Sequence, residues 1–181
     1  GFFEFGSDGV TDEGTPDISR SERLWVHPGL RPLVGLDRKT SSPIACYRWE
    51  HTDRALTEQL ALEDEGYAAT PEPGHAAIRY TNPTTGGDVM PTIRAEFHRL
   101  RAGAHTRPRR DVGSLVFQVF EGQGRFDLGG TPHDVAKGDM IVVPSWVEWS
   151  LETDEGVDLF AFSDAPIVER LHFNRTIISE G

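Results

Sequence analysis

The sequence has little cysteine, no long apolar run and no excess of basic residues. Its single cysteine, Cys46, excludes an intrachain disulfide and a cysteine-based zinc site, and it fits a reducing cytoplasm. No apolar run approaches the roughly 20 residues that span a bilayer. Asp and Glu number 29 against 18 Lys and Arg, a formal net charge of -11. So acidic a surface repels phosphate backbones and anionic membranes, and neither nucleic acid nor a membrane is an expected partner.

The amino-terminal end also lacks a starting methionine and a basic stretch followed by an apolar one. The second absence predicts that there is no secretory signal, in line with a cytoplasmic location. The chain opens with GFFEF (residues 1–5), which is unusually apolar for a free tail. We therefore expect the sequence to be a piece of a longer protein.

Three regions of different composition follow one another along the 181 residues, a length that suits one globular domain. Residues 1–45 mix acidic, Gly and Pro stretches with apolar clusters and predict an extended arm that lies along another surface. Residues 46–75 predict a packing helix and a connector. Residues 76–181 carry a β pattern and predict a barrel.

The helix of the second region is predicted over residues 52–65. Thr52 is placed to cap its start, and Leu56 and Leu60 lie one turn apart on its apolar side. Gly66 is placed to end it. A helix of this kind is expected only to pack against the barrel.

Short strands separated by Gly, Asp and Pro fill the third region. In residues 93–100 apolar and polar side chains alternate, which puts Ile93, Ala95 and Phe97 on one face. Further strands are predicted over 115–121, 124–128, 140–144, 147–151 and 157–162, with a last short helix over 166–172. Closely spaced strands of this kind are typical of an all-β sandwich or closed barrel.

Three segments in a fixed order carry a more specific signal. They are GAHTRPRRD (residues 103–111), VFEGQG (residues 119–124) and KGDMIVVP (residues 137–144). Together they resemble the two-part signature of the cupin superfamily, which implies a jelly-roll (double-stranded β-helix) barrel. In this interpretation the Gly residues of the second segment close a strand pair, and the final Pro ends a strand at the barrel mouth.

In a metal-binding cupin this signature supplies two His two residues apart, often a Glu, and a third His after the Pro. The resemblance places these positions on Arg109, Asp111, Leu115 and Trp149. Arg, Leu and Trp do not ligate metals, and one carboxylate is not a site. We therefore expect a vestigial pocket at these four residues, with no metal and no catalytic residue in this chain.

Other stretches resemble one particular family, the gentisate 1,2-dioxygenases. They include YRWEHT (residues 47–52), RYTNPTTGGDVMPT (79–92), RLRAGAHTR (99–107), VPSW (143–146) and FSDAP (162–166). The resemblance covers most of residues 40–170 and fits the second half of the family's two-cupin chain. It implies that the full-length enzyme opens the ring of gentisate or a related hydroxybenzoate with Fe(II) and dioxygen, and that the iron sits in an N-terminal cupin absent here.

The histidines add no obvious metal site. They are His27, His51, His75, His98, His105, His133 and His172. Glu96 and His98 are expected on one strand face, but no third ligand lies nearby in sequence, so a solvated or interfacial polar face is the simpler interpretation.

Arg109 and Asp111, two residues apart on one strand, face the same way. If they face inward, the guanidinium takes the space of the lost cation and Asp111 lies beside it. If the strand end frays, both reach solvent. The sequence leaves these two alternatives level. Trp149 is expected to fill the barrel mouth.

Three functions remain open from the sequence. The first is the metal-free structural cupin of a gentisate-dioxygenase-like enzyme, with the N-terminal cupin half as its partner. The second is a stand-alone cupin that binds a small aromatic or acidic ligand through Arg109. The third is a metal-free isomerase, which needs a buried His–Asp acid/base pair and a Tyr in the barrel. It ranks last because the predicted barrel strands contain no Tyr.

Association is a further expectation. The arm carries apolar side chains that a lone barrel would leave partly exposed, and such surface usually marks a contact. They are Phe2, Phe3, Phe5, Leu24, Trp25 and Leu33. We expect a homodimer or larger assembly.

Overall fold

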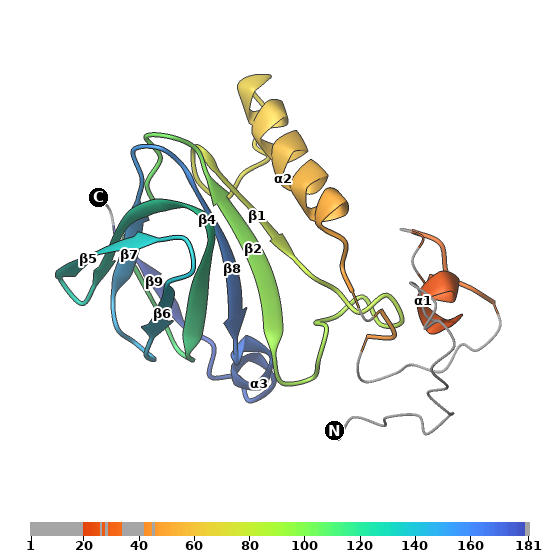
Figure 1. Cartoon of the computed structure of the whole chain (residues 1–181). Helices are drawn as coiled ribbons and strands as arrows, with labels where there is room; N and C mark the ends of the chain where they lie inside the picture. Colours follow the sequence, from red (N-terminus) through yellow and green to blue (C-terminus); the bar gives the residue numbers. More distant parts are fainter. Residues whose placement is uncertain (1–19, 26, 28, 34–41, 45, 180–181) are drawn as a thin grey trace, which may run out of the picture.

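The computed structural model is a curled antiparallel sheet of nine strands flanked by short helices (Figure 1). It describes residues 20–25, 27, 29–33, 42–44 and 46–179. Its elements are α1 (Arg20–Trp25), α2 (Trp49–Asp64), β1 (His75–Arg79), β2 (Arg94–Leu100), β3 (Arg109–Asp111), β4 (Leu115–Leu128), β5 (Thr131–Ala136), β6 (Met140–Val143), β7 (Trp149–Glu152), β8 (Val157–Ser163), α3 (Ala165–Arg170) and β9 (Thr176–Ile178). The predicted all-β jelly-roll class is confirmed. No helix among the described residues is long and apolar enough to cross a membrane.

Strand β4 is the longest strand of the barrel and pairs with four others. Its first half pairs with β6 and β8, and its second half pairs with β5 and β7. The two predicted strands over 115–121 and 124–128 are therefore one strand, and the glycines between them bend it instead of closing a turn. A Cβ on Gly122 would lie 2.2 Å from the Gly156 carbonyl oxygen, so the bend requires glycine.

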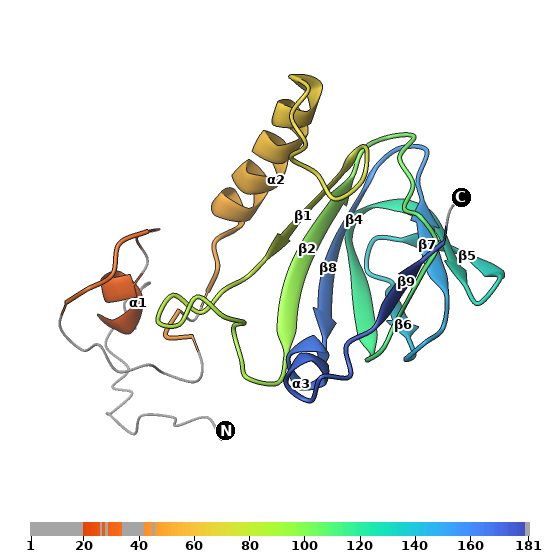
Figure 2. The same ribbon diagram turned by 180° about the vertical axis from the view of Figure 1, so that it is seen from behind.

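The remaining strands follow the order β1-β2-β8-β4-β7-β3-β9 (Figure 1). Turned by 180°, the molecule shows β9 on the side of the barrel away from α2 (Figure 2). Strand β3 is the expected strand of Arg109 and Asp111. The short strands β5 and β9 were not predicted, because six and three residues, with Thr, Pro and Asp among them, carry too weak a periodicity. Tertiary pairing, not propensity, makes them strands.

Two apolar cores lie on opposite faces of the sheet. The larger fills the barrel and includes Phe117, Phe126, Trp149 and Leu159. The smaller lies under α2. Its buried members are Leu56, Leu60, Ala76 and Phe97. The predicted helix thus packs on the outside of the barrel, through the two leucines spaced one turn apart.

Helix α2 begins earlier than predicted. It starts at Trp49, Arg48 is its N-cap, and no side chain caps it. Thr52 is therefore not the cap. It is buried inside the helix, and its hydroxyl is 3.0 Å from the Tyr80 hydroxyl. Contacts of the Trp49 ring with Phe97 and Phe120 extend the helix by a turn that the capping pattern did not indicate.

The other helix boundaries differ less. Gly66 follows the C-cap of α2 with a φ of 90°, as predicted for a helix end. Helix α3 covers Ala165–Arg170, close to the expected range. Within the predicted arm, α1 is helical and Trp25 is buried, whereas Leu33 is exposed. Phe2, Phe3 and Phe5 lie outside the described residues.

Candidate functional site

Strand β3 carries Arg109 and Asp111 and is held on both sides. Arg109 pairs with Trp149 of β7 and with Ile178 of β9, and the Asp111 carbonyl accepts a hydrogen bond of 2.8 Å from the Trp146 amide. The strand end therefore does not fray. The alternation of the strand points both side chains toward the barrel mouth.

The two side chains form a bidentate ion pair. Arg109 Nε donates to Asp111 Oδ2 at 2.9 Å, and Arg109 Nη2 donates to Oδ1 at 2.7 Å. Thr176 of β9 donates a third hydrogen bond to the carboxylate, at 2.7 Å. The side chains are 33% and 26% exposed, so the pair is neither fully buried nor freely solvated. Of the two alternatives left by the sequence, the inward pair is the one formed.

The pKa shifts of the pair follow from this geometry. Burial disfavours the charge of Arg109, but the hydrogen bonds and the charge of Asp111 outweigh burial and raise the Arg109 pKa. Burial likewise disfavours the Asp111 carboxylate, but Arg109 and Thr176 outweigh it and lower the Asp111 pKa. Both groups are therefore charged near neutral pH, and each neutralises the other.

Trp149 fills the barrel mouth behind the pair. Its ring stacks on Phe126 at 5.6 Å between centroids, and the Arg109 guanidinium carbon lies 5.6 Å from its ring centre. Its buried Nε1 atom has no hydrogen-bond partner among the described residues. The indole N–H still helps to lower the Asp111 pKa, at a geometry that falls short of a hydrogen bond. Leu115 packs against the edge of the same core.

All four residues of the predicted pocket line one cavity of about 240 Å³. Its lining contains three arginines and four carboxylates: Arg94, Arg109, Arg175, Glu96, Asp111, Asp164 and Glu169. Arg94 is itself held by Asp88 and Glu169, at 2.8 Å from each. Two of the three guanidinium groups are thus already paired, and with four carboxylates to three arginines the lining offers no excess positive charge to an anion.

The set does not fit an iron ion. Neither a guanidinium nor an alkyl side chain ligates a metal, and the Trp149 nitrogen carries a proton and no accessible lone pair. Both Asp111 carboxylate oxygens already accept hydrogen bonds, from Arg109 and Thr176. Across the residues that the structure describes, no three His, Cys, Asp or Glu side chains come together in a way that could hold a metal.

A second polar pair, not predicted from the sequence, lies deeper in the barrel. The pairing of β1 with β2 makes His75 and His98 diagonal neighbours on the inner face, and His75 Nε2 lies 3.0 Å from His98 Nδ1. Glu96 Oε2 lies 3.9 Å from His98 Nε2. Glu96 and His98 therefore face the barrel interior, whereas the sequence favoured a solvated or interfacial polar face. Only the register of two strands separated by a long connection could have revealed this pair.

His75 is neutral in the folded protein. Burial, then the neighbouring His98 and then Arg109 lower its pKa to about 3. His75 Nδ1 and His98 Nε2 have no hydrogen-bond partner among the described residues. The pair contains no carboxylate partner of His75, and the Tyr80 hydroxyl bonds Thr52 under α2 instead of entering the barrel. The constellation required of an isomerase is therefore not assembled within the part of the chain that the structure describes.

Comparison with known proteins supports the family resemblance. No protein-family model matches. The chain is 54% identical over 176 residues to a gentisate 1,2-dioxygenase of a Streptomyces species, and the match covers 97% of this chain and 49% of that protein. It is 31% identical over 176 residues to a 5-aminosalicylate 1,2-dioxygenase of a Comamonas species, covering 96% of this chain and 44% of the relative.

Solved structures agree. The salicylate 1,2-dioxygenase of Pseudoaminobacter salicylatoxidans, determined as an adduct with gentisate, superposes with a TM-score of 0.92 at 67% identity. That match covers 99% of this chain and 49% of the other. The chain thus spans about half the length of the relatives it matches. These similarities place it in the gentisate 1,2-dioxygenase family, as a segment that corresponds to about half of such a protein.

Proposed function

We propose that this chain is the C-terminal, non-catalytic cupin of a gentisate 1,2-dioxygenase-like enzyme. In this proposal an N-terminal cupin outside the sequence holds Fe(II) and opens the ring of gentisate or a related hydroxybenzoate with dioxygen. Residues 1–45 connect the two cupins, residues 46–75 form the packing helix and connector, and residues 76–181 form the barrel. The complete enzyme works in the cytoplasm as a homo-oligomer.

One observation carries the proposal. The residues that the cupin resemblance assigns to the metal-ligand positions, Arg109, Asp111, Leu115 and Trp149, line one cavity at the barrel mouth, where they form an ion pair and an aromatic stack. A charged pair that satisfies itself leaves neither an open coordination position nor a free base. In this proposal the barrel has a structural role, and catalysis belongs to the other cupin.

The test compares the chain alone with a full-length chain, in which the part of the Streptomyces relative outside the match is joined ahead of residue 1. We call the second protein the joined chain. The chain alone is expected to bind no stoichiometric Fe, Mn or Zn and to consume no oxygen with gentisate or salicylate. The joined chain is expected to hold one iron and to open the ring.

The decisive variant is Arg109→Met/Asp111→Leu in the joined chain. It should keep its iron and its turnover, because neither side chain touches the metal in this proposal. Close to one metal per molecule in the chain alone, lost on Asp111→Ala, would contradict the proposal. So would ring cleavage by the chain alone.

A stand-alone binding role is the second candidate, and one observation favours it. The Trp149 N–H is a buried donor without a partner among the described residues, and it lies beside Arg109 on the cavity of about 240 Å³. Two donors of this kind suit a carboxylate. Against this role, Asp111 already occupies the Arg109 guanidinium. A benzoate-dependent rise in melting temperature that Arg109→Ala abolishes would support it.

A further inference from the structure

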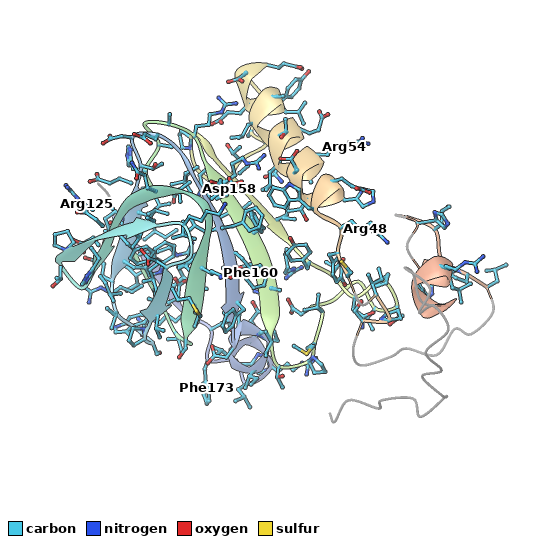
Figure 3. All side chains as sticks on the ribbon, viewed as in Figure 1. Arg48, Arg54, Arg125, Asp158, Phe160 and Phe173 are labelled. Carbon is cyan, nitrogen blue, oxygen red and sulfur yellow. The ribbon has the colours of Figure 1, made fainter. Side chains whose placement is uncertain are left out.

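The outer face of the sheet has two halves, and only one is covered among the described residues. Helix α2 packs over β1 and β2, where it buries Phe97 and reaches Phe160 of β8. Phe160 and Asp158 lie on the middle strand of this face (Figure 3). Beyond β8 the sheet continues into β4 and β6. Among the described elements only the start of α2, at Trp49, reaches the edge of this second half.

The second half is apolar. Register aligns Ala95, Phe162, Val116 and Val142 in one row across β2, β8, β4 and β6, and the next row ends in Gln118 and Met140. The side chains that form this surface, the β4–β6 face, are Val116, Phe120, Met140, Val142 and Phe162.

Three large apolar side chains of the β4–β6 face are more exposed than is usual for a surface that contacts only solvent. Met140 is 62% exposed, Val142 56% and Phe120 44%. Ion pairs lie beside it, Lys137 with Glu121 at 2.6 Å and Arg99 with Asp158 at 2.7 Å. An apolar centre with a polar rim is the arrangement of protein interfaces, and a contiguous exposed apolar patch marks a contact.

We propose that the β4–β6 face docks the other half of the longer chain to which this segment belongs, an inference that rests on the proposed function. Two observations select this occupant. The relatives carry about as many residues again as the part matched here. The face is also continuous with the start of α2, since the Trp49 ring lies 4.6 Å from that of Phe120, so the chain that precedes α2 arrives at its edge.

The chemistry of the face restricts what the other half presents. Met140 and Val142 offer no hydrogen bonds, and Gln118 is the polar side chain of the two central rows. A charged group opposite them would lose its hydration without a partner. The docking partner therefore presents apolar side chains, and the flexible Met140 adapts to their shape.

The experiment is hydroxyl-radical footprinting of Met140 and Phe120 in the chain alone and in the joined chain. Labelling of Met140 should fall at least about fivefold in the joined chain, because the centre of an interface is packed like a protein interior. Tyr67, which is 63% exposed at the far end of α2, should label equally in both and serves as the internal control. Equal labelling of Met140 in both proteins would overturn the proposal.

Two other occupants are distinguished by the chain alone. If a second copy covers the face, labelling of Met140 falls with protein concentration, and the joined chain shows no further protection. If the arm covers it, labelling is already low and rises when residues 1–19 are deleted. Either result overturns the docking proposal.

Val142→Asp separates this inference from the proposed function. The side chain is exposed, so the chain alone should keep its melting temperature, whereas the joined chain should regain Met140 labelling. Tyr67→Asp is the matched control and should leave labelling protected. If Met140 is protected from labelling in the unmodified joined chain but that chain does not cleave the ring, the proposed function is refuted and the docking proposal stands. If the joined chain cleaves the ring while Met140 is fully labelled, the docking proposal is refuted and the proposed function stands.

Discussion

The barrel contains two polar pairs that meet the cost of burial in opposite ways. At the mouth, Arg109 and Asp111 keep their charges and neutralise each other. Deeper inside, His75 and His98 share one hydrogen bond, and His75 gives up its charge. The difference follows from solvent access. A bidentate ion pair remains stable when it is partly exposed, whereas burying a charged imidazole in the core costs more free energy than burying a neutral one. Neither solution leaves a set of free ligands for a metal.

The largest effect is expected from breaking the pair at the mouth. Asp111→Ala leaves the Arg109 charge without its partner and should lower the free energy of unfolding by about 2–3 kcal/mol, less than for a fully buried pair because both side chains reach solvent. Arg109→Met/Asp111→Leu should cost about 1 kcal/mol or less, since both desolvation costs vanish. Urea unfolding measures both. Small, additive losses would show that the pair behaves as a surface pair.

The histidine pair should reveal itself through pH. His75 has a pKa of about 3 in the folded protein and an ordinary pKa of 6.5. Between these values the unfolded chain binds the extra proton, so stability falls as pH decreases below 6.5, by about 2–3 kcal/mol at pH 4.5. The change should be absent above pH 7.

His75→Gln tests this assignment because glutamine does not titrate. It should remove most of the stability loss between pH 6.5 and 4.5, which thermal melts at several pH values will measure. His133→Gln, at an exposed position on β5, is the control and should retain the loss. Parallel pH profiles for both variants and the unmodified chain would refute the role of His75.

A smaller effect is expected from the strand that completes the mouth. Thr176→Val removes the 2.7 Å hydrogen bond to Asp111 but keeps the ion pair, and should cost about 1 kcal/mol. Thr131→Val, at the exposed start of β5, is the matched control. If Thr176→Val costs no more than the control in urea unfolding, β9 does not contribute to holding the pair.

The smallest effect is expected from an exposed ion pair, which serves as the reference for the pair at the mouth. Arg125 and Asp134 form an ion pair at 3.4 Å with side chains 58% and 88% exposed. Arg125 lies on the far side of the molecule from α2 (Figure 3). Arg125→Ala should change the free energy of unfolding by less than about 0.5 kcal/mol. A loss as large as that of Asp111→Ala would mean that exposure does not distinguish the two pairs.

Local sequence patterns predicted much of the fold. Alternation located β2, β6 and β8, the spacing of Leu56 and Leu60 located α2, and the resemblance brought Arg109, Asp111, Leu115 and Trp149 to one mouth. The same patterns missed β5 and β9, which are strands because β5 pairs with β4 and β9 pairs with β3. The start of α2 was misplaced because aromatic packing of Trp49, not a side-chain cap, sets it.

The sequence by itself determined the class of barrel and the family, because each depends on which residue types stand at which spacing. Only the tertiary structure decided that Arg109 meets Asp111 and that His75 meets His98. It also decided that α2 covers one half of the sheet and leaves Met140 and Val142 exposed on the other. These features depend on strand register and on the side of the sheet to which a helix folds, and both are fixed by contacts between residues far apart in the chain.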